Sequence, residues 1–327
     1  MKVRRRYALR LFSCVSLVLL SLLPIQAPAA EKTWRIGFLS PAIRDSFHDP
    51  FFKGLRELGY IEGRNFILQP RLAAATQRRL TEAAVDLAKL RVDVIVARGT
   101  QATLAAKKAT GTIPIIMTGS SDPVGTGLVA SLAQPGANVT GMSIVAPDLA
   151  EKRLELLKRV VPGSRFVVLW NPTNAGNVNE WEQSKAAANR LQITLISREV
   201  RQPKDIYRAF KSLRPRTIDA VVTLTDALLS TGRTDIVHFA ANNRLPGIFH
   251  LIDFVEQGGL MSYGPDLHHS FYRAAYYVDR VLKGANPANL PVEQPTKFEL
   301  AINLQTAKQI GVMIPIDVLA LANRVIK

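Results

Sequence analysis

Apolar runs of strand length alternate with amphipathic segments of helical spacing along most of this chain. The run "WRIGFLS" (34–40) precedes "PFFKGLRELGY" (50–60), and "VDVIVARG" (92–99) precedes "TQATLAAKKAT" (100–110). Short apolar runs predict buried strands, and a helix between successive strands is typical of parallel sheets covered by helices on both faces. The alternation therefore predicts an α/β fold and excludes all-helical and all-β architectures.

The same alternation continues to the C-terminus. Further strands are predicted at residues 65–73, 113–119, 165–171, 193–200, 219–226, 246–250 and 259–266. Further helices are predicted at residues 79–90, 125–132, 150–162, 180–191, 203–213, 236–244 and 270–284, with a last strand and helix within 297–311. Two α/β units in tandem predict two Rossmann-like lobes with parallel sheets, facing each other across a cleft.

A chain of 327 residues exceeds the size of one ordinary hydrophobic core and favours two domains. The extra elements near the C-terminus complete each lobe in turn, so three crossings between the lobes are expected. We predict an N-terminal lobe of residues 33–145 plus 253–294. The predicted C-terminal lobe is formed by residues 146–252 plus 295–327.

The first 29 residues have the pattern of a cleavable signal peptide. Five basic residues lie within residues 1–10, a mostly apolar run spans residues 11–23, and Ala27 and Ala29 form an A-x-A cleavage site. The apolar run is shorter than the ~20 residues of a membrane span, which disfavours the alternative of an uncleaved anchor. We therefore expect export to the periplasm, with cleavage after Ala29 or Ala30 left open.

The single cysteine and the charge narrow the possible activities. Cys14 lies inside the apolar run rather than after it, so acylation is not expected, and the mature chain would contain no cysteine nucleophile or thiolate metal site. Without the five N-terminal bases, 37 of the 42 Lys and Arg residues remain against 26 acids. These bases are scattered and lack interleaved aromatic residues, so we expect a solvated surface and no nucleic-acid partner.

Polar residues recur where the predicted strands end. Ligands bind beyond the carboxyl ends of the strands in open α/β sheets, and exposed N–H groups of helix N-termini favour anions. Each such residue is individually explained as a helix cap or turn former, but the recurrence favours a binding cleft. These segments are 40–44, 99–101, 118–122, 171–174, 225–226, 249–250 and 263–266.

Signatures of cofactor binding, metal binding and catalysis are weak. Gly125, Gly127 and Ala130 match a GxGxxA dinucleotide fingerprint, but Asp122 to Val124 separate them from the preceding strand, and the expected acid is missing. The five histidines have no metal-ligand spacing, and no GxSxG nucleophile motif is present. We therefore expect no cofactor, no metal and no enzymatic activity.

Four stretches carry a family resemblance: "DPVGTGLVASLAQPGANVTGMS", "ELGYIEGRNF", "GLMSYGPDLHHSFYRAAYYVDRVLKGANPANLPVEQPTKFELAINLQTAKQIG" and "IPIDVLALANRVI". From about Trp34 onward the chain resembles ABC-transporter substrate-binding proteins of the tryptophan/tyrosine type. The resemblance implies a type I periplasmic-binding fold with three hinge crossings and delivery of a small solute to a membrane permease. Carried over by motif, the ligand-binding residues would be Thr100, Ser120, Asp122, Asn171, Thr225 and Asp226; Ser40 joins them by position alone.

The resemblance leaves the ligand open. The "SPAIRDSFHDP" loop, Arg98 before the Gly-Thr pair, and Trp170 in place of the usual tyrosine depart from the amino-acid-binding members. A small polar solute is expected, with an amino acid or a related carboxylate as one class, bound by a monomer. Two alternatives remain: an exported sensor that presents its ligand state to a signalling partner, and an exported hydrolase that uses Asp226 and His250.

Overall fold

The computed structural model describes residues 32–41, 48–73, 76–211, 213 and 217–327. Trp34–Lys327 forms one compact unit, and the predicted signal peptide and Cys14 lie outside the described residues. Within the described part of the chain, no helix is both long and apolar enough to span a membrane.

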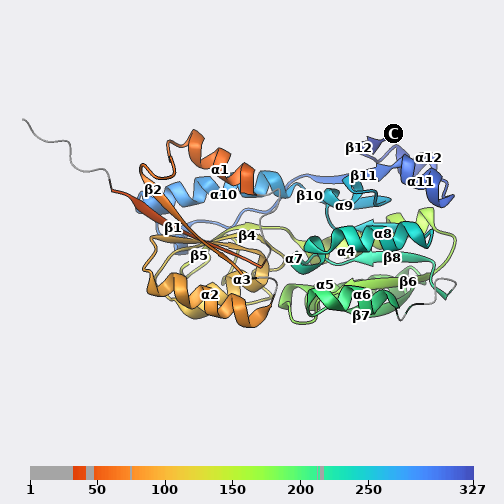
Figure 1. The fold of residues 1–327 in the computed structure, drawn as a ribbon, viewed down its shortest axis with the longest axis horizontal. Helices are drawn as coiled ribbons and strands as arrows, with labels where there is room; N and C mark the ends of the chain where they lie inside the picture. Colours follow the sequence, from red (N-terminus) through yellow and green to blue (C-terminus); the bar gives the residue numbers. More distant parts are fainter. Residues whose placement is uncertain (1–31, 42–47, 74–75, 212, 214–216) are drawn as a thin grey trace, which may run out of the picture. The chain divides into compact units, whose positions relative to one another are not determined.

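The first sheet contains five parallel strands in the order β2-β1-β3-β4-β5 (Figure 1). The strands are β1 (Trp34–Ser40), β2 (Phe66–Leu72), β3 (Val94–Arg98), β4 (Ile115–Ser120) and β5 (Val139–Ser143). The helices α1 (His48–Glu57) and α10 (Leu267–Leu282) pack together on one face, and α2 (Gln77–Lys89) and α3 (Gly99–Ala109) pack together on the other. We call this sheet with its helices the N-lobe.

The second sheet contains seven strands in the order β12-β11-β10-β9-β8-β6-β7, and we call it with its helices the C-lobe. Its strands are β6 (Arg165–Trp170), β7 (Thr194–Glu199), β8 (Ala220–Thr223), β9 (Gly247–Phe249), β10 (Met261–Pro265), β11 (Phe298–Asn303) and β12 (Arg324–Ile326). Its helices are α4 (Ala146–Val160), α5 (Ala175–Arg190), α6 (Pro203–Lys211), α7 (Ala227–Thr231), α8 (Arg233–Asn242), α9 (Ile252–Glu256), α11 (Leu304–Ile310) and α12 (Ile316–Leu319). Within this mostly parallel sheet, β10 and β11 are antiparallel.

The chain crosses between the lobes three times. The first crossing lies between β5 and α4, and the second follows Pro265, because β10 pairs with β9 and β11 whereas α10 packs on the N-lobe sheet. The third lies between Glu293, which bridges to Met142, and β11. The structure thus places the second crossing after Pro265 rather than at the predicted residue 253. The residues of a buried strand do not indicate which sheet the strand joins.

The segment 125–132, predicted as a short helix, forms turns. Asp122 and Pro123 accept hydrogen bonds from the backbone N–H groups of Thr126 and Leu128, and Gly127 has a φ of +69°. A positive φ is incompatible with a right-handed helix. The unpredicted strand β5 follows this turn.

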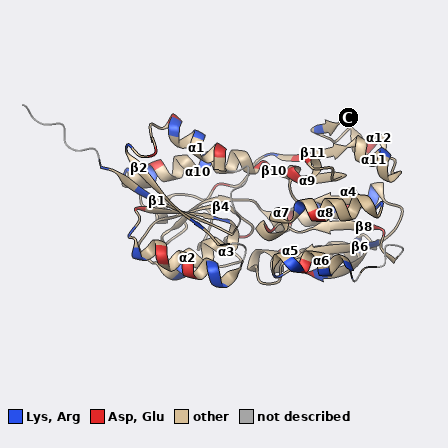
Figure 2. Ribbon diagram, viewed as in Figure 1, with Lys and Arg blue, Asp and Glu red and all other residues tan. Residues whose placement is uncertain are grey.

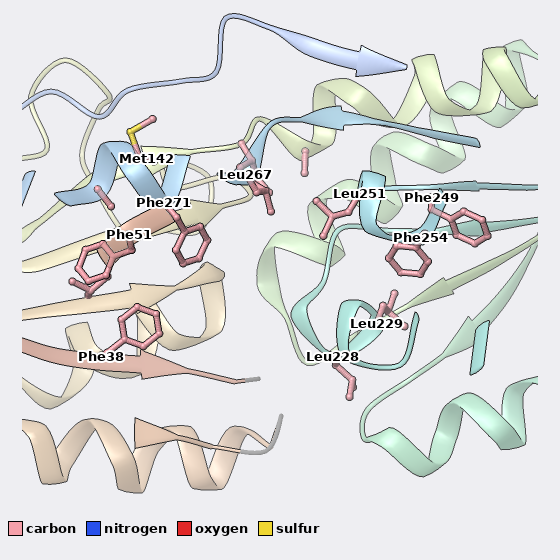
Figure 3. Close-up of a cluster of buried hydrophobic side chains, with 14 of the residues drawn as sticks. Phe38, Phe51, Met142, Leu228, Leu229, Phe249, Leu251, Phe254, Leu267 and Phe271 are labelled. Atoms are coloured by element: carbon pink, nitrogen blue, oxygen red, sulfur yellow. The ribbon is translucent and has the colours of Figure 1, made fainter. Parts of the chain in front are cut away.

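The hydrophobic core is continuous between the two lobes along one face. One cluster contains Phe38, Phe51 and Phe271 of the N-lobe together with Phe249 and Phe254 of the C-lobe. Figure 3 shows Leu267 and Leu251 between these two groups of rings. Charged residues of both signs are interspersed along the helices of both lobes (Figure 2). The apolar residues of the crossings therefore join the lobes, while the charge is distributed over the surface.

Candidate ligand-binding site

A cavity of about 40 Å³ lies between the two lobes, at the carboxyl ends of their strands. The N-lobe contributes Arg98, Thr100, Gln101, Ser121, Leu267 and Phe271 to its lining. The C-lobe contributes Asn174, Thr225, Asp226, Ser230, His250 and Leu251. This is the position at which open α/β sheets bind ligands.

On the N-lobe side, the start of α3 opens into the cavity. Gly99 has a φ of +73°, which turns the chain directly from β3 into the helix, and no acidic residue lies in the first turn. The first N–H groups of a helix lack intrahelical partners and carry partial positive charge. Arg98, only 5% exposed, adds a guanidinium to the same end of α3. This side of the cavity therefore presents a guanidinium and a helix N-terminus.

On the C-lobe side, Asp226 caps the helix α7. Its Oδ1 accepts from the N–H groups of Leu228 and Leu229, and its Oδ2 accepts from Asn174 Nδ2 (2.8 Å) and Asn171 Nδ2 (3.3 Å). Burial raises the pKa of Asp226, and these four hydrogen bonds oppose the rise because they stabilise the charged form. The carboxylate thus lies in the cavity wall, held in one orientation.

Thr225 is held by a buried ion pair below the cavity. Arg153 Nη1 lies 2.5 Å from Glu180 Oε1, and both side chains are almost completely buried. Glu180 accepts from the N–H (2.8 Å) and the hydroxyl (3.1 Å) of Thr225, and Arg153 also donates to Tyr263 O. Burial raises the pKa of Glu180, which the Arg153 charge opposes. The network connects α4, α5, β10 and the loop after β8.

His250 is a neutral, fully hydrogen-bonded side chain. Ser230 Oγ donates to Asp226 O, so its oxygen can accept from His250 Nε2 (2.9 Å), and Nδ1 then accepts from the Thr223 hydroxyl (2.9 Å). Burial lowers the pKa of His250 well below its usual value, and the charges of Arg153 and Arg98 lower it further. Among the hydrogen bonds of the described residues, none joins His250 to a carboxylate, so the Asp226–His250 pair of the hydrolase hypothesis is not formed.

The sequence-predicted residues occupy three kinds of position. Thr100, Thr225 and Asp226 line the cavity. Ser120 and Asn171 lie behind it, each hydrogen-bonded to a lining residue (Thr100 and Asp226). Ser40 is fully buried and, with Asp122, lies outside the lining.

Several lining residues are absent from the ligand-binding set that the sequence predicts. Gln101, Asn174 and His250 lie in strand-end segments that were recognised, and Arg98 stood out only as a departure from the family pattern. Leu267 and Phe271 carried no signal, because apolar positions on an amphipathic helix look the same whether they contact a sheet or a cleft.

The two lobes touch each other beside the cavity. Gln101 Nε2 donates to Thr173 Oγ1 (3.1 Å), and Asn179 Nδ2 donates to Asp122 Oδ2 (2.8 Å). Asp122 Oδ1 also accepts from the N–H of Gly125, within the turn after β4. Asp122 thus connects the lobes.

Residues 36–326 match the model of the family described as "ABC transporter substrate binding protein". The chain belongs to this family. Its fold is the type I periplasmic-binding fold, and members typically work outside the cytoplasm or in the periplasm. A tyrosine-binding protein of Clostridioides difficile is 29% identical over 259 residues, which cover 79% of this chain and 74% of that protein. The chain is thus a solute-capturing component of an ABC transporter, and its relatives are binding proteins rather than enzymes.

Each of two solved structures aligns with 90% of this chain and over its own full length. A Streptococcus pneumoniae domain in complex with L-Trp has 27% identity and a TM-score of 0.83. The ligand-free, open structure of a Clostridium difficile substrate-binding protein has 26% identity and a TM-score of only 0.61. At nearly equal identity and coverage, this chain thus superposes more closely on the ligand-bound relative than on the open, ligand-free one.

Proposed function

We propose that this substrate-binding protein captures an α-amino acid as a zwitterion in the cavity between its lobes. Asp226 accepts the ammonium group of the ligand, and Arg98 with the first turn of α3 holds the carboxylate. The observation that carries the proposal is the pairing of charges. Of the described residues that line the cavity, Arg98 is the one basic and Asp226 the one acidic side chain, and they come from opposite lobes.

The electrostatics support this orientation. Buried charges are stable when a partner of opposite charge is present, and burial raises the pKa of Asp226, so an ammonium would stabilise its charged form. A carboxylate at the start of α3 would interact with the guanidinium and with the helix N-terminus. Thr100 and Thr225 supply hydroxyl groups to the two sides.

The apolar part of the wall would receive the ligand's side chain. Ile144, Leu251, Leu267 and Phe271 line the cavity. Its volume of about 40 Å³ is enough for only a few water molecules. The names of two relatives, a tyrosine-binding protein and a complex with L-Trp, support an amino acid as the ligand class.

The proposal also covers export of the chain and its partner in the membrane. The chain would be exported through the predicted signal peptide of residues 1–29, act in the periplasm as a monomer, and deliver its ligand to an ABC permease. Intact-mass analysis of protein from the native host should show an N-terminus at Ala30 or Glu31. A retained or acylated N-terminal segment would contradict this part.

The ligand class is tested by calorimetry with a panel of L-amino acids that includes tyrosine and tryptophan. For the tightest binder, the matching amine and the matching desamino acid are also titrated. Asp226→Asn should weaken binding of the amino acid by roughly tenfold to a hundredfold, because a charge-assisted contact is lost. It should have little effect on the desamino acid. Arg98→Gln should have the converse pattern and spare the amine.

Asp86→Asn, an exposed position on α2, is the matched control and should leave binding unchanged. Melting curves of each variant separate binding from folding. Equal losses for all three compounds would refute the assigned orientation, and the absence of binding to any amino acid would refute the ligand class.

A further inference from the structure

The start of α5 contacts the N-lobe beside the cavity. Thr173 precedes the helix and contacts Gln101, and Asn179 on the helix contacts Asp122. Between them, Gly176 lies against the N-lobe residues Thr100 and Ser121. A Cβ atom at Gly176 would lie 2.7 Å from the Ser121 Cβ and 2.9 Å from the Thr100 Oγ1.

Gly176 is therefore explained by the approach of the lobes and not by its own backbone. It is the second residue of α5 and is not among the positive-φ glycines, so a larger residue could adopt its conformation. The space is needed only when Thr100 and Ser121 are in contact with α5, which is when the lobes are together.

Of the residues in this contact, Thr173, Gly176, Asn179 and Asp122 do not line the cavity. They therefore do not contact a ligand in the cavity. They can, however, change how much of the protein is in the closed arrangement. The apparent affinity of a ligand that binds one conformation falls in proportion to the population of that conformation.

We propose that Thr173, Gly176 and Asn179, at the start of α5, form a closing contact that determines ligand affinity without touching the ligand. Gly176 provides the space for the approach. Asn179 donates a hydrogen bond to Asp122 of the N-lobe, and Thr173 accepts one from Gln101. These are positioning residues, since they act by bringing Arg98 and Asp226 to one cavity. The effect on affinity rests on the proposed function, but the effect on lobe closure does not.

Two glycines provide a matched test. Gly176→Ala should weaken binding of the probe, L-tyrosine or L-tryptophan, by roughly tenfold to a hundredfold, since overpacking would penalise only the closed state. Gly54 of α1 is the control: its Cβ would lie 2.7 Å from Tyr272 O and 2.8 Å from the Ala275 Cβ, both within the N-lobe. Gly54→Ala should lower the melting temperature and leave affinity for the folded protein unchanged.

Two asparagines of α5 provide a finer test. Asn179→Ala should weaken probe binding by roughly threefold to tenfold, because one hydrogen bond to a carboxylate across the lobes is lost. The exposed Asn189, at the other end of the same helix, is the control, and Asn189→Ala should have no effect on binding.

Lobe closure is measured directly with a pair of spin labels in the full chain carrying Cys14→Ser. The labels are attached at Arg79→Cys of α2 and Lys185→Cys of α5, both exposed positions in different lobes. Without added amino acid, Gly176→Ala should shift the distance distribution toward longer distances than the parent shows. A distribution and an affinity both unchanged by Gly176→Ala would overturn the proposal. If the parent binds no amino acid of the panel, the proposed function fails, and the label distances still decide the closing contact.

Discussion

The two halves of the cavity are built differently. On the C-lobe side, Asp226 accepts four hydrogen bonds, Thr225 is held by a buried ion pair, and both nitrogens of His250 are bonded. On the N-lobe side, the contacts behind Thr100 join neutral groups: its Oγ1 meets Ser120 Oγ at 3.2 Å and accepts from the Ser121 N–H at 3.1 Å. Much of the remaining N-lobe wall is apolar.

This difference indicates a division of roles. A preorganised site loses less conformational entropy on binding, so we infer that the C-lobe half supplies most of the affinity and that the N-lobe half closes over the bound ligand. The contacts of α5 with Asp122 and Gln101 would then complete the closed state. Three predictions test the contrast.

The largest effect is expected at the ion pair. Glu180→Gln should lower the free energy of unfolding by about 3–5 kcal/mol, because Arg153 would remain buried without its counter-charge. The glutamine amide would also place an N–H group against the Thr225 N–H and Asn177 Nδ2, which donate to Glu180 in the parent protein. Urea denaturation of the variant and the parent measures this difference.

Two further variants test whether that loss of stability comes from the buried ion pair. Glu182→Gln, exposed on the same helix and paired with Lys185, should change stability by no more than about 0.5 kcal/mol. The double variant Arg153→Met with Glu180→Leu should recover most of the stability, yet still bind ligand weakly because Thr225 is no longer held. Normal binding by the double variant would show that the pair does not position the site.

An intermediate effect is expected from acid. Burial lowers the pKa of His250 in the folded protein, so below its ordinary value of about 6.5 the unfolded chain binds a proton that the folded chain does not. The stability contributed by the neutral imidazole is therefore present above pH 6.5. It is lost as the pH falls, by up to about 1.4 kcal/mol per pH unit.

Urea denaturation at pH 7.5, 6 and 5 measures this loss. His250→Gln should show a shallower decrease than the parent protein, because the side chain no longer titrates. His238→Gln, an exposed position on α8, should follow the parent. Parallel curves for all three proteins would exclude His250 as the source of the acid sensitivity.

The smallest effect is expected on the N-lobe side. Ser120→Ala removes the hydroxyl contact with Thr100 and should lower the free energy of unfolding by about 0.5–1.5 kcal/mol. The Ser121 N–H would still reach Thr100 Oγ1. A loss as large as that of Glu180→Gln, measured in the same urea series, would remove the contrast between the two halves.

Residue patterning by itself determined the fold class and most elements of this protein. The strands of residues 34–40 and 92–99 and the helix of 100–110 agree with β1, β3 and α3 to within a few residues. Such predictions succeed because strand and helix periodicity are local consequences of which face is buried. The motifs also indicated the family, and the strand ends included Thr100, Thr225 and Asp226 of the cavity wall.

Only the tertiary structure decided which sheet a strand joins and which polar groups meet. The residues of β10 do not indicate its partners, so its place beside β9 and β11 depends on segments elsewhere in the chain. Asp122 has the sequence context of a ligand-binding turn, yet its Oδ2 accepts from Asn179 of the other lobe. Arg98 and Leu267 reach one cavity although 169 positions separate them. Long-range pairing and side-chain direction depend on the packed whole, and no local pattern encodes them.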